Sequence, residues 1–311
     1  MAQWTAADIP DQTGTTIVVT GANSGLGLRS AEALAAKGAE VVMACRNAAK
    51  AAAAIDSVKA VASGPAPRVV SLDLASLASV RECAAGLARD FDHIDVLMNN
   101  AGIMAVPKST TVDGFESQIG TNHFGHYALT GLLLPTLLAA PAPRVVTVSS
   151  NAHKFGRMHL DDLFFEHTHY SRWRAYGQSK LSNLLFSGEL QRRAAAAGTA
   201  LTAAAAHPGY AATNLTSGPA TGAALLRPVL AVADRIAGQP DHMGALPQLY
   251  AATMPDVGAD DYWGPDSFRE QRGHPKRVGR TKQAQDRDAA RVLWERSEQL
   301  TGVTYPWPQG L

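Results

Sequence analysis

The chain has 311 residues, of which 46% are apolar and 18% are charged, so it can bury a sizeable core and is not expected to be disordered. Its formal net charge of +1 gives no general attraction to nucleic acid or to an anionic membrane surface. These properties exclude the nucleic-acid-binding and disordered classes and favour a globular α/β protein.

Sequence features also predict where the protein works. Cys45 and Cys83 are the only cysteines, which does not suggest a disulfide framework and fits a reducing compartment. Residues 1–10 contain no apolar segment typical of a signal peptide. The apolar stretch 129–142 is too short to span a bilayer and contains Pro135. We therefore expect a soluble, cytoplasmic protein.

The first predicted element is a buried strand that leads into a glycine-rich turn and a helix. Ile17 to Val19 form a β-branched run that suits a strand covered on both faces. Glycines in the turn allow the backbone to turn tightly and to approach a bound group. The helix expected over residues 28–36 would direct free N–H groups at that group, which favours a pyrophosphate. An ordinary glycine-rich turn is the alternative, and the strand–turn–helix context argues against it. The expected cofactor contacts in this turn are Gly21, Asn23, Ser24, Gly25, Leu26 and Gly27.

Strands and helices then alternate along the chain. This alternation predicts parallel strand pairing and right-handed crossovers. We therefore expect a Rossmann-type doubly wound parallel sheet with helices on both faces, in a single domain over residues 1–311. Ligands bind such sheets outside the carboxyl ends of the strands. The expected strands are 39–45, 68–72, 94–98 and 144–148, and the expected helices are 47–62, 76–90 and 115–138.

The residue after the second strand predicts the type of dinucleotide. Arg46 lies about twenty residues beyond the glycine turn, where a cation accepts the 2′-phosphate of NADP and a carboxylate would bind the ribose of NAD. The nearest acid, Glu40, lies at the opposite end of the strand. The sequence therefore predicts NADP(H) in preference to NAD(H), and a solvated surface arginine is the alternative.

Two further strand ends carry expected cofactor contacts. Asp73 and Leu74 are placed to touch the adenine, although Asp73 also fits an acid at a helix N-terminus. Asn100, Ala101 and Gly102 follow the fourth strand, where small residues would let the cofactor lie against the strand end. A simple turn is the alternative.

A candidate catalytic group follows the fifth strand. Ser149 and Ser150 end that strand, and a later helix carries Tyr176 and Lys180 one turn apart on one face. A nearby ammonium would lower the tyrosine pKa, so that the phenol could exchange a proton with a carbonyl or alcohol oxygen. A serine hydroxyl could hydrogen-bond the same oxygen. The Tyr-x-x-x-Lys spacing alone is weak evidence, because a solvated helix face produces it often.

Together these motifs resemble the short-chain dehydrogenase/reductase superfamily over almost the whole chain. The finer pattern is similar to the retinol-dehydrogenase-like branch, which includes the protochlorophyllide reductases. The motifs that carry the resemblance are Thr20-Gly21-x-x-x-Gly25-x-Gly27, Asp73, Asn99 to Gly102, Asn122, Ser150 and Tyr176-x-x-x-Lys180, and those that carry the branch are Ala44 to Arg46, Asn122 to Thr130, Ser149 to His153, Tyr176 to Leu190 and His207 to Gly209.

The resemblance implies a role for each matching residue. Tyr176 would be the general acid/base, and Lys180 would lower its pKa and hold the nicotinamide ribose. Ser150, the second serine of the pair, would bind the reacting oxygen. Asn122 would anchor a water that links Lys180 to a proton relay. The nicotinamide amide and the phosphates would be lined by Pro208, Gly209 and Thr213.

The implied activity is that of an NADP(H)-dependent alcohol dehydrogenase or carbonyl reductase acting on a small molecule. A non-catalytic dinucleotide-binding sensor or scaffold with the same fold is the main alternative. A related isomerase or a light-driven reductase is another. Assembly into a homo-oligomer is left open.

Several segments outside these motifs remain ambiguous. Residues 151–175 form either a wall of the substrate pocket or a surface excursion, and their scattered histidines do not suggest a metal site. Residues 210–280 fall where relatives place substrate-covering segments, and a helix is expected over 220–237. A docked surface helix is expected over 281–300. Tyr262 to Pro265 and Tyr305 to Pro308 are expected to pack on the body or on another subunit.

Overall fold

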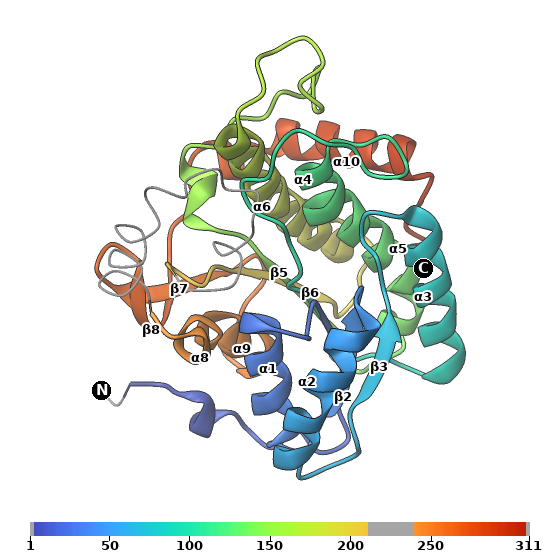
Figure 1. Ribbon diagram of the computed structural model, residues 1–311, viewed down its shortest axis with the longest axis vertical. Helices are drawn as coiled ribbons and strands as arrows, with labels where there is room; N and C mark the ends of the chain where they lie inside the picture. Colours follow the sequence, from blue (N-terminus) through green and yellow to red (C-terminus); the bar gives the residue numbers. More distant parts are fainter. Residues whose placement is uncertain (1–2, 211–238, 309–311) are drawn as a thin grey trace.

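The computed structural model describes residues 3–210 and 239–308. Its strands form one sheet in the order β3-β2-β1-β4-β5-β6-β7-β8, in which only the β7–β8 pair is antiparallel (Figure 1). This confirms the predicted doubly wound α/β sheet. The strands are β1 (Thr16–Thr20), β2 (Glu40–Cys45), β3 (Arg68–Ser71), β4 (Val96–Asn99), β5 (Arg144–Val148), β6 (Thr202–Ala206), β7 (Tyr262–Ser267) and β8 (Arg272–Arg277).

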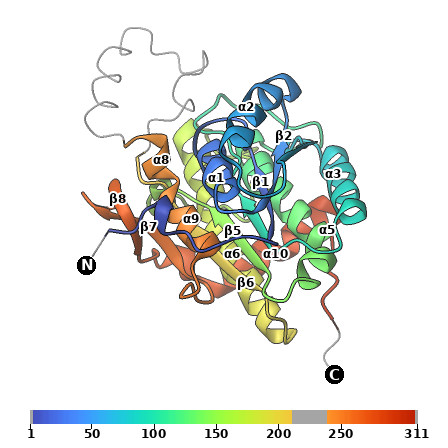
Figure 2. The same cartoon turned by 90° about the horizontal axis from the view of Figure 1, so that it is seen from below.

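Helices cover both faces of the sheet, with α1, α2, α8 and α9 on one side and α3, α5 and α6 on the other (Figure 1). Figure 2 shows α3 and β8 at opposite sides of the molecule. The helices are η1 (Ala6–Asp8), α1 (Gly25–Ala35), α2 (Ala48–Val61), α3 (Leu77–Asp90), α4 (Ser117–Ile119), the π-helical turn η2 (Gly120–Phe124), α5 (Gly125–Leu138), η3 (Asn151–Lys154), α6 (Arg172–Ala196), α8 (Asp241–Gly244), α9 (Leu246–Thr253), η5 (Gln283–Gln285) and α10 (Arg287–Thr301). No helix within the described ranges is both long and apolar enough to cross a bilayer.

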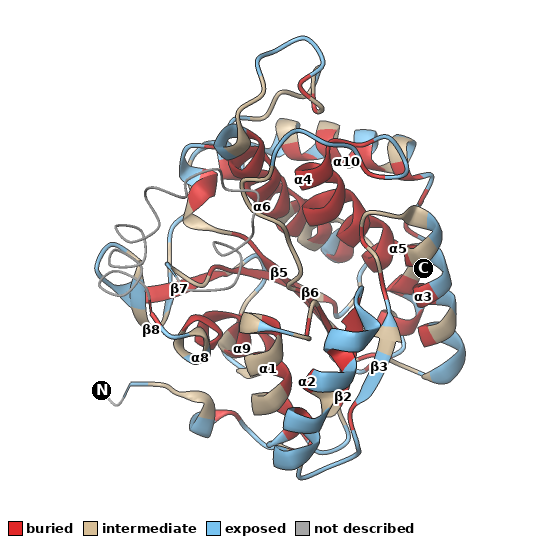
Figure 3. Cartoon of the chain, viewed as in Figure 1, coloured by how far each residue is buried: buried red, intermediate tan, exposed pale blue. Residues whose placement is uncertain are grey.

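Strand side chains alternate between the two helical layers. In β1, Ile17 and Val19 pack with α1, α2 and α9, whereas Val18 packs with α3, α5 and α6. All three side chains are fully buried. This burial on both faces explains why the central strands are continuous apolar runs. The edge strand β3 is largely exposed (Figure 3).

The expected helix over residues 115–138 is interrupted. The π-helical turn η2 separates α4 from α5, and it contains Asn122. Gly120 and Gly125 lie at the ends of this region, where a Cβ atom would collide with Thr111 and with the Leu74 carbonyl. The close approach of neighbouring segments therefore accompanies a local change of helical pitch, as is frequent at functional sites.

Three strands were not predicted from the sequence. The strand β6 is an alanine run, and alanine has a weak preference for strands. The strands β7 and β8 contain glycine and proline, which usually argue against a strand. They are tolerated here because the pair forms the edge of the sheet. The helix expected over 220–237 lies outside the described residues.

The C-terminal segment docks on the body, as predicted. Trp294 of α10 stacks on Phe186 of α6 and lies 4.5 Å from the Tyr305 ring, centroid to centroid. The Tyr305 hydroxyl donates a hydrogen bond to the Tyr127 carbonyl at 2.8 Å. This aromatic cluster fixes α10 across α5 and α6.

The cluster gives the first prediction, which concerns stability. Trp294 is only 2% exposed, so Trp294→Ala should lower the free energy of unfolding by about 3–5 kcal/mol through lost burial and a residual cavity. Urea denaturation measures the change. Trp173→Ala is the matched control, because that side chain is 54% exposed and should cost much less. Equal losses in the two variants would show that α10 does not contribute to the core.

Candidate active site

A cavity of about 530 Å³ opens at the carboxyl ends of β1, β2 and β4. Its position is the one at which doubly wound sheets bind ligands. The structure brings together there eleven of the seventeen predicted cofactor contacts. The lining includes Gly21, Asn23, Ser24, Gly25, Leu26, Gly27, Arg46, Leu74, Asn100, Ala101 and Gly102.

The glycine turn has the geometry that a pyrophosphate requires. Gly21 and Gly25 have φ angles of 68° and 52°, which favour glycine. A Cβ atom on Gly27 would lie 2.6 Å from the Asn100 amide nitrogen and would collide with the Gly21 carbonyl. No side chain caps the N-terminus of α1 at Ser24. The first N–H groups of α1 are therefore available to an anion, and the turn fits a dinucleotide.

The end of the cavity that lies between the end of β2 and the start of α2 is basic. Arg46 and Asn47 line it together with Lys50, which lies in the first turn of α2. The Asn47 side chain caps α2 by accepting from the Lys50 backbone N–H at 2.9 Å. No carboxylate is among the lining residues in the described part of the chain. Sequence reasoning missed Lys50, although its position four residues after Arg46 was a usable signal.

Asp73 does not line the cavity. Its carboxylate accepts from the Ala75 backbone N–H at 3.0 Å, and its own N–H donates to the Ser79 hydroxyl. These bonds organise the loop before α3. The helix N-terminal role that the sequence left open belongs to Ser76, which is the N-cap of α3. An adenine contact by Asp73 stays a prediction.

The predicted catalytic side chains meet beside this cavity. The Ser150 hydroxyl lies beside the Tyr176 phenol and acts to lower its pKa. The Lys180 ammonium lies 5.9 Å from the centre of the Tyr176 ring and donates to the Val148 carbonyl at 3.1 Å. A Cβ atom on Gly102 would lie 3.4 Å from Lys180 Nζ. The lysine therefore borders both the phenol and the lining of the cavity.

Burial shifts the pKa values of both Tyr176 and Lys180. It raises the pKa of Tyr176 to about 12, and the Ser150 hydroxyl opposes this rise only in part. Burial also lowers the pKa of Lys180 to about 8. In the free protein burial dominates the pKa of the phenol, and the ammonium is directed at a carbonyl, so a lowering of the tyrosine pKa by Lys180 stays a prediction.

The two serines of the Ser149–Ser150 pair have different partners. The Ser149 hydroxyl donates to the Lys180 carbonyl at 2.7 Å and is hydrogen-bonded to the Tyr262 phenol. The Ser150 hydroxyl faces Tyr176 instead. Ser149 therefore ties β5 to α6, and Ser150 is the serine placed beside the phenol.

Asn122 is fully buried and joins three segments. Its Oδ1 accepts from the Ile103 backbone N–H at 2.8 Å, and its Nδ2 donates to the Ile103 carbonyl and to the Ser179 hydroxyl, both at 2.9 Å. The backbone carbonyl oxygen of Asn122 is 3.0 Å from His126 Nδ1. The water-anchoring role expected for Asn122 stays a prediction, and the side chain is placed to hold the β4 loop against α6.

The loop after β6 carries Pro208 and Gly209, and it lies beside the loop after β5 because those strands pair in register. Gln239 Nε2 donates to the Pro208 carbonyl at 2.7 Å. The contact of Pro208 and Gly209 with a nicotinamide stays a prediction. Thr213 lies outside the described residues.

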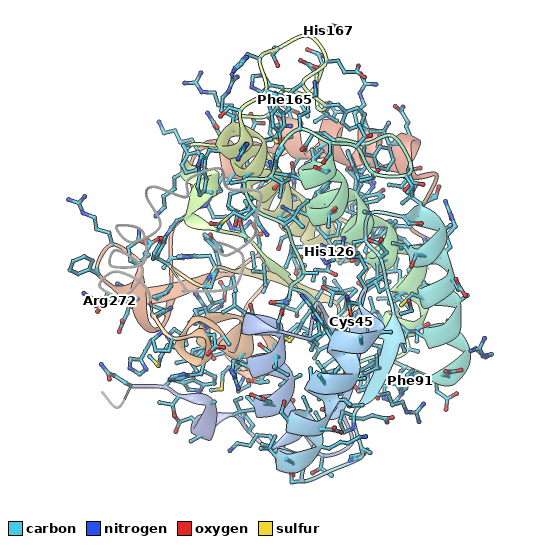
Figure 4. The ribbon with its side chains drawn as sticks, viewed as in Figure 1. Cys45, Phe91, His126, Phe165, His167 and Arg272 are labelled. Carbon is cyan, nitrogen blue, oxygen red and sulfur yellow. The ribbon has the colours of Figure 1, made fainter. Side chains whose placement is uncertain are left out.

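The segment 151–175 is partly a surface excursion, and its expected role as a wall of the substrate pocket stays a prediction. Figure 4 shows His167 at the tip of a protruding loop and Phe165 closer to the body. Lys108 Nζ donates to the Phe165 carbonyl at 2.6 Å, and the Tyr170 hydroxyl donates to the carbonyl of Val106, a cavity-lining residue. The loop tip is therefore a surface excursion, and its base braces the rim of the cavity.

Comparisons with known proteins agree with this geometry. A family profile described as short chain dehydrogenase matches residues 15–221. Human retinol dehydrogenase 13 is 37% identical over 94% of this chain and 86% of its own length, and mouse retinol dehydrogenase 14 is 39% identical over 93% and 86%. A crystal structure of an uncharacterized protein from Mycobacterium paratuberculosis is 47% identical, covers 98% of this chain and 100% of its own, and has a TM-score of 0.81.

The buried lysine gives the second prediction. The unfolded-state pKa of a lysine is about 10.4, and the folded value of about 8 is lower, so the unfolded state binds more protons between these values. Wild-type stability from this group therefore rises with pH through that window. Lys180→Met should raise the free energy of unfolding at pH 7 by roughly 1–3 kcal/mol, and the advantage should shrink toward pH 10.

Urea denaturation of the two proteins at pH 7 and pH 10 measures this gap. The Val148 carbonyl keeps a hydrogen bond from Asn183 at 3.0 Å in the variant, so no acceptor is left unpaired. Lys59→Met, at a half-exposed site, is the control and should change stability little at either pH. A variant less stable than wild type at pH 7 would contradict the prediction.

Proposed function

The chain belongs to the short chain dehydrogenase family of oxidoreductases, and on this premise we propose that it is an NADP(H)-dependent carbonyl reductase or alcohol dehydrogenase. The observation that carries the proposal is the placement of the Ser150 hydroxyl, the Tyr176 phenol and Lys180 side by side, at a cleft whose other end is basic. A bound nicotinamide would supply the hydride and, in its oxidised form, a positive charge.

The proposed mechanism assigns a step to each side chain. Ser150 and Tyr176 would hydrogen-bond the substrate oxygen and hold it in one position. During carbonyl reduction Tyr176 would donate its proton to that oxygen as negative charge develops there. A phenol with a pKa of about 12 is protonated at neutral pH, which suits the acid role. Lys180 would stabilise the phenolate that remains.

The preference for NADP(H) is proposed from the basic end of the cavity. Arg46 and Lys50 are two cations placed where the 2′-phosphate of NADP binds in dinucleotide folds. The N-terminus of α2 adds the partial positive charge of a helix end. Among the described residues, no lining carboxylate is present to accept from the ribose 2′-hydroxyl of NAD.

The substrate is proposed to be a small alcohol or carbonyl compound with an apolar surround. The Trp173 ring packs edge-on against Tyr176 with centroids 6.1 Å apart, and Phe155 lies close to Gly177 of the same helix. Both aromatic side chains are more than half exposed. We place the substrate-covering segments at residues 151–175 and 210–280 of a single domain, of which 211–238 lie outside the described residues.

The third prediction tests the proton donor. Tyr176→Phe should lower kcat for carbonyl reduction by about 10²–10⁴, because the proton must then come from water. The dissociation constant for NADPH should not change. NADPH oxidation with a panel of aldehydes and ketones measures the first, and a fluorescence titration measures the second. Tyr250→Phe is the control, because it removes a hydroxyl that donates a hydrogen bond to Asp256 away from the cavity.

Equal turnover by Tyr176→Phe and wild type would refute the mechanism. Binding of NADPH by wild type without turnover of any substrate in a broad panel would instead favour the sensor or scaffold alternative.

The fourth prediction tests the cofactor preference. Arg46→Asp should weaken NADPH binding about tenfold or more, because it replaces attraction to the 2′-phosphate by repulsion. Binding of NADH should weaken less or become tighter. Titration with each cofactor measures both changes, and Arg89→Asp, on the exposed surface of α3, is the charge-matched control. A wild-type protein that binds NADH more tightly would refute the preference.

A further inference from the structure

The β7–β8 hairpin reaches the loops that follow β5 and β6. Its turn is formed by Phe268, Arg269 and Glu270, which all have left-handed φ angles between 53° and 64°. The Glu270 carbonyl accepts from Asn151 Nδ2 at 3.0 Å, and the Gln271 carbonyl accepts from the Tyr210 N–H at 2.8 Å. The hairpin thus contacts both the segment after Ser150 and the segment after Gly209.

The Glu270 carboxylate lies between these two loops. It accepts from Lys154 Nζ of η3 at 2.7 Å, and the same oxygen is 3.5 Å from His207 Nε2 at the end of β6. The glutamate side chain is 28% exposed, whereas the His207 side chain is fully buried. Its interactions with His207 and Lys154 lower the pKa of Glu270 to about 2, so the carboxylate is ionised at neutral pH.

The hydrogen bonds of His207 determine its tautomer. Its Nδ1 accepts from the Gly209 backbone N–H at 3.2 Å, so the neutral ring carries its hydrogen on Nε2. Nε2 lies 3.5 Å from the Glu270 carboxylate and has no hydrogen-bond partner among the described residues, so this contact is electrostatic. A Cβ atom on Gly264 of β7 would collide with Nε2, so this glycine makes room for the ring. Contacts from the β7–β8 hairpin therefore fix the orientation of the His207 ring. That orientation in turn allows Nδ1 to accept the hydrogen bond from the Gly209 N–H.

We propose that Glu270 is a positioning residue for hydride transfer. Through His207 it fixes the Pro208-Gly209 turn, and through Lys154 it holds the same turn at a constant distance from the segment that carries Ser150. The inference rests on the proposed function, in which Pro208 and Gly209 contact the nicotinamide end of the cofactor. Glu270 itself touches neither substrate nor cofactor in this assignment. No sequence motif marks it, because its partners come from distant segments.

The proposal predicts that loss of the Glu270 carboxylate weakens binding of the nicotinamide half of the cofactor and not of the adenine half. NADPH spans the glycine turn, the basic end and the Pro208-Gly209 turn, whereas adenosine 2′,5′-bisphosphate occupies only the adenine half. Loss of the Glu270 carboxylate should therefore weaken NADPH binding and lower kcat, and it should leave adenosine 2′,5′-bisphosphate binding unchanged. A general loss of structure would weaken both ligands together.

The experiment compares Glu270→Ala and Glu270→Gln with wild type by calorimetric titration of both ligands and by kcat for a carbonyl substrate that wild type reduces. Glu270→Ala should raise the NADPH dissociation constant about tenfold and change that of the bisphosphate by less than about twofold. Glu270→Gln should restore NADPH binding to within about threefold of wild type, because its amide oxygen can take the place of the carboxylate oxygen beside His207 Nε2. Glu295→Ala breaks the exposed pair with Arg291 on α10 and is the matched control.

Three results would overturn the inference. The first is an unchanged NADPH dissociation constant and kcat in Glu270→Ala, and the second is equal weakening of both ligands. The third is a Glu270→Gln variant as defective as Glu270→Ala, because the contact with His207 would then not be the cause. A wild-type protein that binds no NADPH and reduces no carbonyl would refute the proposed function itself, before any variant is compared.

Discussion

The side chain of Asn122 is the contact on which the candidate active site depends. Its amide is fully buried and uses both donors and its oxygen, pairing with the Ile103 backbone and with the Ser179 hydroxyl. The Ser179 hydroxyl in turn donates to the Tyr176 carbonyl. The loop that lines the cofactor cavity and the helix that carries the phenol are therefore held by one side chain. Replacement of that side chain would remove the partners of the partly buried backbone N–H and carbonyl groups of Ile103, which carries a free-energy cost.

The π-helical turn that contains Asn122 extends this connection to β1. The Asn122 backbone carbonyl is paired with His126 Nδ1, and His126 Nε2 lies 2.9 Å from the Thr20 hydroxyl. Burial lowers the pKa of His126 to about 4, so the ring is neutral and can donate from Nδ1 while accepting at Nε2. The Thr20 hydroxyl also accepts from the Ala101 backbone N–H. The ends of β1 and β4 are thus fixed relative to the turn by neutral hydrogen bonds alone.

The sequence predicted those features that local patterning determines. Runs such as Ile17 to Val19 predict buried strands because both faces are covered, and the glycine turn predicts an anion site because its backbone conformation excludes other residues. Contacts between distant segments could not be predicted. Glu270 meets His207 only through the β7–β8 hairpin, whose glycine and proline argue against a strand. The Tyr176–Lys180 spacing correctly predicted proximity, but spacing does not report burial, and burial determines both pKa values.

Burial shifts the pKa values of Tyr176 and Lys180 in opposite directions for the same physical reason. Desolvation disfavours the phenolate of Tyr176 and the ammonium of Lys180 alike, so both groups shift toward their neutral forms. A neutral phenol is ready to donate a proton, but the phenolate left behind is then unfavourable unless positive charge is close. Within this part of the site Lys180 is the cation nearest the phenol ring, and its own protonation is weakened by the same burial. In the proposed mechanism, the dry environment that strengthens electrostatic contacts in the site would therefore also make proton transfer from Tyr176 depend on the protonation of Lys180.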